Sequence, residues 1–268
     1  MIESSAPTSN AATAATDSVD LLGVRFAALT ESEATEWILE RCGTEGGWVS
    51  TPNVQQLQLI SRDPELRELT ATAALTVADG MPLVWASVLQ GTPLPERVAG
   101  SSLVWSLARA VRERDASLFL LGGDEGVAAR AAQRLCAEMP GLSIVGTHYP
   151  PVGFERDEQQ RALIRERLRA ARPDIVYVGL GFPKQERLIA ELRDEFPEMW
   201  FLGIGASLSF LSGDRSRAPR WLQRVGLEWM HRLALEPRRL FRRYVVEGVP
   251  FTLRLLLVSA VRRRQSAQ

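Results

Sequence analysis

Short apolar runs alternate with amphipathic segments along most of this chain. Runs with the composition of buried strands lie at residues 47–53, 74–80, 116–123, 142–148, 174–179 and 199–208. The segments between them have apolar residues at helical spacing, at residues 30–43, 54–73 with a break at Pro64, 82–89, 103–112, 127–139, 158–173 and 185–196. Strands that alternate with helices predict an α/β domain with a mostly parallel sheet covered on both faces.

The pattern divides the chain into three parts. Residues 1–19 are small and polar, with neither a basic nor an apolar block, and predict a disordered leader rather than a signal peptide. Residues 20–212 hold the alternating pattern and predict a Rossmann-like domain. Residues 213–268 lack strand-like runs and are rich in Trp and Arg, so they predict a helical appendage.

Composition adds little, but the distribution of charge is informative. The 268 residues contain 46% apolar and 24% charged side chains, which excludes a wholly disordered or fibrous protein. The 32 basic and 32 acidic side chains cancel, yet residues 214–268 hold thirteen Arg and four acids, a net charge of +9. The rest of the chain therefore carries −9. This division predicts an anionic surface or ligand near the C-terminus.

The same appendage ends in an apolar segment, residues 249–261, which Arg254 interrupts and residues 262–264, all Arg, follow. No run of 18 or more uncharged apolar residues occurs, so we expect this segment to lie on a membrane surface rather than to cross a bilayer. Nucleic-acid binding is an alternative for the basic tail, but its apolar residues argue against it.

Other site chemistries find no support in the sequence. Cys42 and Cys136 match no metal or redox spacing and are expected to be reduced thiols. There is no Asp-x-Asp motif, no His/Cys cluster and no Gly-x-Ser-x-Gly motif. The sequence therefore predicts no metal site, no cofactor and no serine hydrolase.

Polar and glycine clusters follow the predicted strands at their carboxyl ends, where ligands bind in such folds. Asp79 follows one strand and either caps the next helix or acts as a general base. The Gly122-Gly123 pair and Asp124 stand between a strand and a helix, so they either contact a nucleotide diphosphate and ribose or form a tight turn with a capping residue. We predict one ligand-binding edge built from these clusters.

Read together, several segments resemble the WecG/TagA/CpsF glycosyltransferase family (glycosyltransferase family 26). The resemblance covers roughly residues 20–247. It rests on TPNVQQLQLISRDPEL, VADGMPLVWASVLQGTPLPERVAGSSL, LFLLGGDEGVAARAAQRL, RPDIVYVGLGFPKQE and, above all, DRSRAPRWLQRVGLEWMHRLALEPRRLFRRY. The apolar residues after Gly248 are expected to extend beyond the usual appendage.

The resemblance implies an inverting, metal-independent enzyme that moves a sugar of the N-acetylmannosamine type from a UDP-sugar to a polyprenyl-diphosphate-linked acceptor. Such an enzyme is cytoplasmic and peripheral on the inner face of the cell membrane. The resemblance makes Asp79 the catalytic base. It also implies substrate-binding residues, which are Thr51, Asn53, Arg97 and Gln185, and arginines that meet the lipid diphosphate, which are Arg232, Arg239 and Arg242.

Two points stay open at this stage. The loop at residues 149–154 carries two prolines where the family has a short Gly-aromatic loop, so sugar specificity changes if this loop touches the donor. The alternative to an enzyme is a non-catalytic nucleotide-sugar-binding protein or membrane scaffold of the same fold. The donor hexose, the acceptor sugar and self-association into a homo-oligomer are not decided by the sequence.

Overall fold

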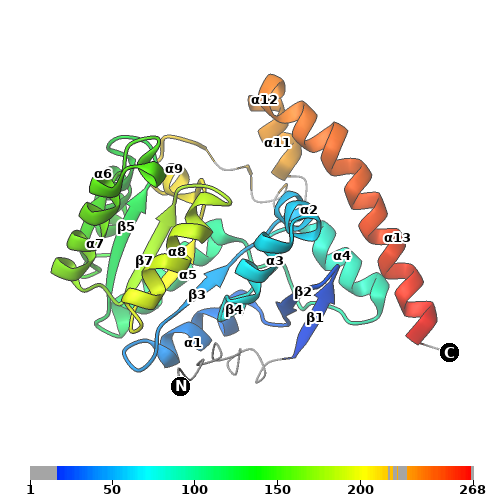
Figure 1. Cartoon of the computed structure of the whole chain (residues 1–268), viewed down its shortest axis with the longest axis horizontal. Coiled ribbons are helices and arrows are strands. Elements are labelled where there is room, and N and C mark those ends of the chain that lie inside the picture. The colour runs from blue at the N-terminus through cyan, green and yellow to red at the C-terminus, as the bar shows by residue number, and fades with distance from the viewer. Residues whose placement is uncertain (1–16, 217, 220–221, 223–227, 267–268) are drawn as a thin grey trace, which may run out of the picture.

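The computed structural model of the protein describes residues 17–216, 218–219, 222 and 228–266 (Figure 1). Within these residues the main sheet has six strands, all parallel, in the order β4-β3-β8-β7-β5-β6. The strands are β3 (Gly47–Ser50), β4 (Leu75–Thr76), β5 (Ser117–Gly122), β6 (Ser143–His148), β7 (Ile175–Gly179) and β8 (Trp200–Gly203). The predicted parallel sheet is confirmed.

Helices pack on both faces of this sheet, as predicted. One face is covered by α1 (Glu31–Arg41), α5 (Gly100–Glu113), α6 (Val127–Glu138) and α9 (Ser207–Leu211). The other face carries α7 (Glu158–Ala171), which follows the short 3-10 helix η2 (Phe154–Arg156), and α8 (Lys184–Glu195). Large side chains from the strands fill both layers: Tyr177 and Trp200 point to the first face, Trp48 and Phe201 to the second.

A third core lies beside the sheet. It joins the antiparallel hairpin of β1 (Ser18–Leu21) and β2 (Val24–Ala27) to the helices α2 (Val54–Arg62), α3 (Pro64–Ala71) and α4 (Met81–Gln90). The expected leader is too long by two residues at its C-terminal end, because Ser18 and Val19 belong to β1 and Val19 is buried. Residues 1–16 of that leader lie outside the described part of the chain.

Local hydrogen bonds explain several of the helix boundaries. Thr30 begins α1 with a reciprocal capping box, in which its hydroxyl accepts from the backbone N–H of Glu33 and the Glu33 carboxylate accepts from the backbone N–H of Thr30. Asp63 ends α2 and caps α3, and Pro64 takes the first position of α3, so the predicted break is a junction between two capped helices.

The predicted strand at residues 199–208 is too long. β8 ends at Gly203, and Ser207 begins the short helix α9. Gly205 separates the two elements with φ of +50°. The apolar residues at the end of this run therefore pack as a helix, and Leu208 and Leu211 are buried in the core.

The appendage consists of helices, as predicted, in the part of it that is described. They are α11 (Glu228–Leu235), α12 (Pro237–Phe241), the π-helix η3 (Arg242–Gly248) and α13 (Val249–Ser266). Trp229 and Tyr244 meet edge to face with ring centroids 6.2 Å apart, which fixes α11 against η3. Figure 1 shows α13 running along α4, and Phe251 and Leu255 of α13 are buried in the third core.

One helical stretch among the described residues, Arg242–Gln265, is long and apolar enough to cross a membrane by length and composition. From the sequence we expected no segment long enough to cross a membrane. The criterion behind that expectation was too strict, because it required a run of apolar residues without any charge. Phe251 and Leu255, on one side of this stretch, are buried against the body.

Candidate active site

A cavity of about 840 Å³ opens at the carboxyl ends of the parallel strands. Its walls come from the loops after β3, β5, β6, β7 and β8 and from the appendage elements α11, α12 and η3. Seven of the predicted site residues line it, which are Thr51, Asn53, Asp79, Gly123, Asp124, Gln185 and Arg232. The clusters that the sequence predicts at one edge of the sheet therefore line one cavity, and the appendage forms part of its wall.

Asp79 is half-buried in the cavity wall. Its backbone N–H donates to the Pro52 carbonyl at 3.1 Å, which continues the parallel pairing of β3 and β4 beyond their last residues. The N-cap of α4 is Gly80, and no side chain caps this helix end. Asp79 thus stands one residue before the cap position and lines the cavity, which is the position that a general base would need.

Arg232 of α11 lines the same cavity. Its guanidinium donates to Glu228 Oε1 at 2.6 Å and lies 5.0 Å from the ring centroid of Phe210. Burial lowers the pKa of Arg232, but the ion pair and hydrogen bond with Glu228 and the charges of Tyr244 and Asp79 together raise it above its usual value. The fixed cation of the appendage and the carboxylate of the body therefore interact across one site.

Arg97 does not line the cavity, in contrast to the sequence expectation of a substrate contact. Its Nη1 lies 3.3 Å from Glu228 Oε2, and both side chains are largely buried. Glu228 thus stands between Arg97 of the body and Arg232 of the appendage. The sequence analysis missed Glu228, although one of only four acids in a strongly basic segment was a usable signal.

Thr51 and Asn53 line the cavity and also hold its walls together. The Thr51 hydroxyl donates to the Gly203 carbonyl at 3.2 Å and so ties the end of β3 to the end of β8. Asn53 Oδ1 accepts from the backbone N–H groups of Gln55 and Gln56 at the start of α2. This cap requires Oδ1 alone, which leaves the Asn53 amide nitrogen as the group of that side chain suited to a ligand.

Gln185 is almost fully buried, and its amide joins two glycine loops. Its Oε1 accepts from Gly181 N at 3.2 Å and from Gly205 N at 3.0 Å, while its Nε2 donates to Glu186 Oε1 at 2.7 Å. Gly203 makes room for this arrangement, because a Cβ at that position would lie 2.8 Å from Gln185 Nε2. Gln185 therefore shapes the cavity wall through hydrogen bonds that already use its amide.

Glu186, which the sequence analysis did not single out, lies behind this wall. Its side chain is buried, its Oε2 has no hydrogen-bond partner among the described residues, and burial raises its pKa to about 7. The hydrogen bond from Gln185 acts in the opposite direction and is the smaller effect. A buried carboxyl group with a pKa of about 7 therefore lies directly behind the cavity wall.

The glycine turn after β5 contributes two of its three predicted residues to the cavity. Gly123 and Asp124 line it, whereas Gly122 lies underneath, with φ of +113° and no room for a Cβ, which would sit 2.5 Å from the Gly179 carbonyl oxygen. Gly126 is the N-cap of α6 and no side chain caps that helix, so Asp124 is not its cap. Gly122 thus acts by allowing β5 and β7 to approach closely.

The predicted arginine face of the appendage is only partly correct. Arg242 points away from the cavity, is 83% exposed and pairs with Glu247 at 3.0 Å. Arg243 lines the cavity instead, with its guanidinium 5.7 Å from the Tyr244 ring centroid. Consecutive residues of a helix project in different directions, and here Arg243 is the one that lines the cavity. The side chain of Arg239 lies outside the described part of the structure.

The proline-containing loop also reaches the site. All six of its residues, 149–154, line the cavity, and Val152 at its tip is almost fully exposed. Lys184 lies in the same wall and pairs with Glu155. The region that departs from the family pattern is therefore in a position to contact a ligand.

Among the described residues, no three His, Cys, Asp or Glu side chains come close enough together to hold a metal ion. His148 ends β6, and burial followed by the charge of Arg167 lowers its pKa, so it is neutral at pH 7. The chemically distinctive groups of the cavity are consequently carboxylates, guanidinium groups and backbone amides.

The fold is a Rossmann-like α/β domain whose C-terminal helices close one side of the candidate active site. The model of the glycosyl transferase WecG/TagA/CpsF family matches residues 19–266, and the chain belongs to this family of glycosyltransferases. The match extends through α13, which corrects the expectation that the residues after Gly248 lie beyond the usual appendage.

Two curated relatives carry the same name, N-acetylglucosaminyldiphosphoundecaprenol N-acetyl-beta-D-mannosaminyltransferase. The protein from Bacillus spizizenii is 32% identical over 195 residues, which cover 73% of this chain and 74% of the relative. The protein from Bacillus subtilis is 31% identical over 194 residues, covering 72% and 73%.

Proposed function

We propose that this glycosyltransferase moves a sugar of the N-acetylmannosamine type from a UDP-sugar to a polyprenyl-diphosphate-linked acceptor. The names of the two relatives support both the transferred sugar and the lipid-linked acceptor. The observation that carries the proposal is the presence of Asp79 and Arg232 in one cavity, the first from the sheet edge and the second from the appendage.

In the proposed reaction Asp79 is the general base. A sugar hydroxyl is a poor nucleophile, so a carboxylate that takes its proton during attack on C1 of the donor lowers the barrier, typically by 10²–10⁴-fold in rate. The new bond forms from the acceptor oxygen to C1 while the bond from C1 to the UDP oxygen breaks and UDP leaves with the electron pair. Attack opposite the leaving group inverts the anomeric centre.

The phosphates are assigned to the cationic and amide-rich walls. The turn at Gly123 and Asp124 is proposed for the nucleotide, with backbone N–H groups near the diphosphate and the carboxylate near the ribose. Arg232 and Arg243 are proposed for the lipid diphosphate, because guanidinium groups bind phosphate oxygens in pairs. These groups supply the positive charge that a metal-independent transfer requires.

The location proposed is the inner face of the cell membrane, with α13 lying on the bilayer surface. The buried Phe251 and Leu255 favour this arrangement over a crossing helix, because crossing would pull both out of the third core. Exposed Leu253, Leu257 and Val261 supply the apolar contact on the opposite side.

The test is a transfer assay with full-length protein, UDP-N-acetylmannosamine and a synthetic polyprenyl-diphosphate N-acetylglucosamine. We expect product with the opposite anomeric configuration by NMR and turnover that survives a metal chelator. Asp79→Asn should bind the UDP-sugar normally and lose turnover by at least about 10²-fold. Near-normal turnover of that variant would remove Asp79 as the base, and product with retained configuration would exclude single displacement.

A non-catalytic nucleotide-sugar-binding protein is the second candidate for the same cavity. Asp79 distinguishes the two candidates, since a general base is required for transfer, whereas in a binding protein the same carboxylate would only accept hydrogen bonds from sugar hydroxyls. The same assay with other UDP- and GDP-sugars distinguishes the two candidates. Transfer from another nucleotide sugar would identify a different donor, whereas no transfer from any of them would favour the binding protein.

A further inference from the structure

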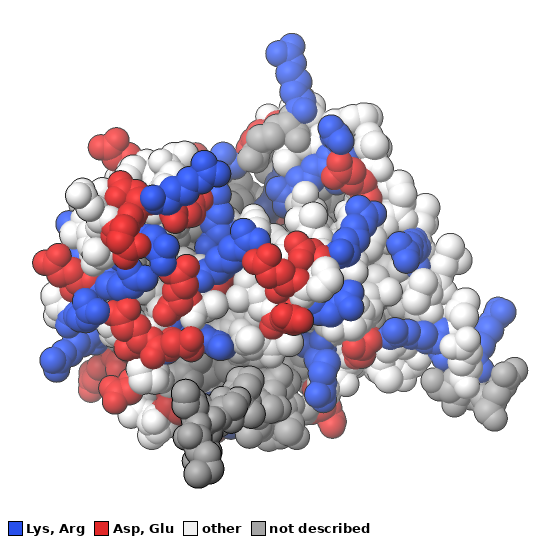
Figure 2. Space-filling view, viewed as in Figure 1, with Lys and Arg blue, Asp and Glu red and all other residues white. Residues whose placement is uncertain are grey.

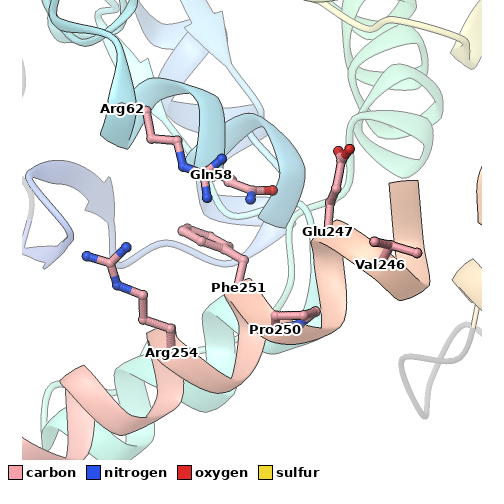
Figure 3. Close-up of a pocket in the computed structure, with 7 residues that line it drawn as sticks. All are labelled: Gln58, Arg62, Val246, Glu247, Pro250, Phe251 and Arg254. Atoms are coloured by element: carbon pink, nitrogen blue, oxygen red, sulfur yellow. The ribbon is translucent and has the colours of Figure 1, made fainter. Parts of the chain in front are cut away.

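A second groove, of about 320 Å³, lies between α2 and the C-terminal helices (Figure 3). It is separate from the active-site cavity, although α2 lines both. Gln55, Gln56 and Leu59 face the cavity, whereas Gln58 and Arg62 face the groove. The groove is thus a distinct feature on the outer side of the helix that Asn53 caps.

Two arginines from distant parts of the chain meet at this groove. Arg62 ends α2 and Arg254 belongs to α13, and Figure 3 shows their side chains on either side of Phe251. Within the described residues neither guanidinium is paired with a carboxylate. Glu247 lies at the other end of the groove, where its carboxylate is held by Arg242 at 3.0 Å. The groove therefore presents two uncompensated positive charges to a ligand.

An apolar ridge runs directly beside these charges. Leu253, Leu257 and Val261 follow one another at helical spacing on the outer face of α13 and are 57%, 68% and 52% exposed. In Figure 2 the surface over α13 is mostly uncoloured with scattered basic side chains, whereas the surface over α7 and α8 mixes both signs. An exposed ridge of this kind marks an interaction site.

The neighbouring helix continues the apolar surface. Trp85, Val88 and Leu89 of α4 are 42%, 52% and 39% exposed and lie on one helical face. The C-terminal ends of α4 and α13 meet, since a Cβ at Gly91 would lie 3.6 Å from Arg263 Cγ. The basic residues 262–264 close the far end of α13.

We propose that the groove binds the phosphate of an anionic phospholipid headgroup, with Arg62 and Arg254 on the phosphate and the α13 ridge in the acyl-chain boundary. A ligand with a phosphate directly next to an apolar chain matches a cationic groove beside an apolar ridge. Free phosphate leaves the ridge uncovered, and nucleic acid has no alkyl chain to cover a ridge of Leu and Val side chains. The inference rests on the membrane location proposed above but not on the proposed reaction.

The test is flotation of the full-length protein with two kinds of vesicles, phosphatidylcholine alone and phosphatidylcholine with phosphatidylglycerol. The double variant Arg62→Gln/Arg254→Gln should bind the phosphatidylglycerol vesicles about tenfold or more weakly, since each basic residue near an anionic surface contributes markedly to binding. Its binding to phosphatidylcholine vesicles should stay unchanged. The matched control Arg109→Gln/Arg112→Gln, which removes two charges from α5, should bind both vesicles almost as the wild type does.

Three outcomes would overturn the proposal. The groove variant could bind phosphatidylglycerol vesicles as well as the wild type does, or the α5 control could lose as much vesicle binding as the groove variant. In the third, the protein binds inorganic phosphate saturably and the groove variant abolishes that binding without a change in vesicle binding. A fourth concerns a second copy of the chain. If Leu257→Asp converts a dimer to a monomer in sedimentation and leaves vesicle binding intact, the ridge is a protein interface. Failure of the transfer assay leaves the vesicle result unchanged, so the two proposals fail separately.

Discussion

Arg97 Nη1 lies 3.3 Å from Glu228 Oε2, and this ion pair joins the catalytic body to the appendage. The other oxygen of Glu228 accepts from Arg232, which lines the cavity. One carboxylate therefore connects a loop of the body to the cation that faces Asp79. The appendage is positioned by a specific buried contact as well as by the packing of apolar side chains.

The first prediction concerns this contact. Arg97→Gln should lower transfer activity about tenfold or more although Arg97 does not line the cavity, because Glu228 then loses the ion pair that ties it, and with it Arg232, to the body. In a double-mutant cycle with Glu228→Gln, we expect a coupling free energy of unfolding of about 1–3 kcal/mol. Arg112→Gln, at an exposed pair with Glu113, is the control and should change little. Strictly additive effects of Arg97→Gln and Glu228→Gln would show that the two residues act independently.

The second prediction separates two adjacent arginines of η3. Arg243→Gln should raise KM for the lipid-linked acceptor about tenfold or more, because Arg243 lines the cavity. Arg242→Gln serves as the matched control, since Arg242 is exposed and paired with Glu247, and should stay within about twofold of the wild type. Steady-state kinetics at varied acceptor concentration measure both. The reverse ranking would mean that η3 turns in the working enzyme.

The third prediction is a dependence of stability on pH. Burial raises the pKa of Glu186 from 4.5 to about 7, so between these values the folded chain holds a proton that the unfolded chain releases. The stabilisation linked to this group is complete below about pH 4.5 and is lost as the pH rises through 7, by roughly 3 kcal/mol in total.

Glu186→Gln should remove this part of the pH dependence. Urea unfolding at pH 5 and pH 8 measures it, and the difference in unfolding free energy between the two pH values should shrink in the variant. Glu166→Gln, on the exposed side of α7, is the control and should retain the wild-type difference. An unchanged difference in Glu186→Gln would mean that the carboxyl group is already ionised at pH 5.

The fourth prediction tests the close approach of β5 and β7. Gly122→Ala should lower the free energy of unfolding by more than about 2 kcal/mol, because its Cβ would meet the Gly179 carbonyl oxygen at 2.5 Å at a positive φ. Gly141→Ala is a matched control with φ of +90° and open space around its Cβ, and should cost about 1 kcal/mol. If both variants lost the same free energy of unfolding, the positive φ would explain the whole effect and the contact with Gly179 would contribute nothing.

The features of the fold that the sequence by itself determined depend on contacts between residues that are close together in the chain. The helix predicted from residue 30, the break at Pro64 and the alternation of strands and helices follow from hydrogen bonds and apolar spacing within single segments, whereas the capping of α2 by Asn53 was not predicted. The carboxyl ends of parallel strands meet at one edge, which is why Asp79 and Gly123 could be expected in one site. The hairpin of β1 and β2 escaped notice because Leu22 stands at the first turn position, with φ of 54°, where such hairpins usually have Asn, Asp or Gly before the glycine.

Tertiary structure alone decided the roles that depend on residues far apart in the chain. Whether Arg97 meets a substrate or Glu228, and whether Arg242 or Arg243 faces the cavity, depends on where the appendage packs. The burial that raises the pKa of Glu186 and the meeting of Arg62 with Arg254 likewise require the assembled layers. A sequence pattern reports the periodicity of one segment, whereas charge pairing and desolvation are set by the neighbours that folding brings together.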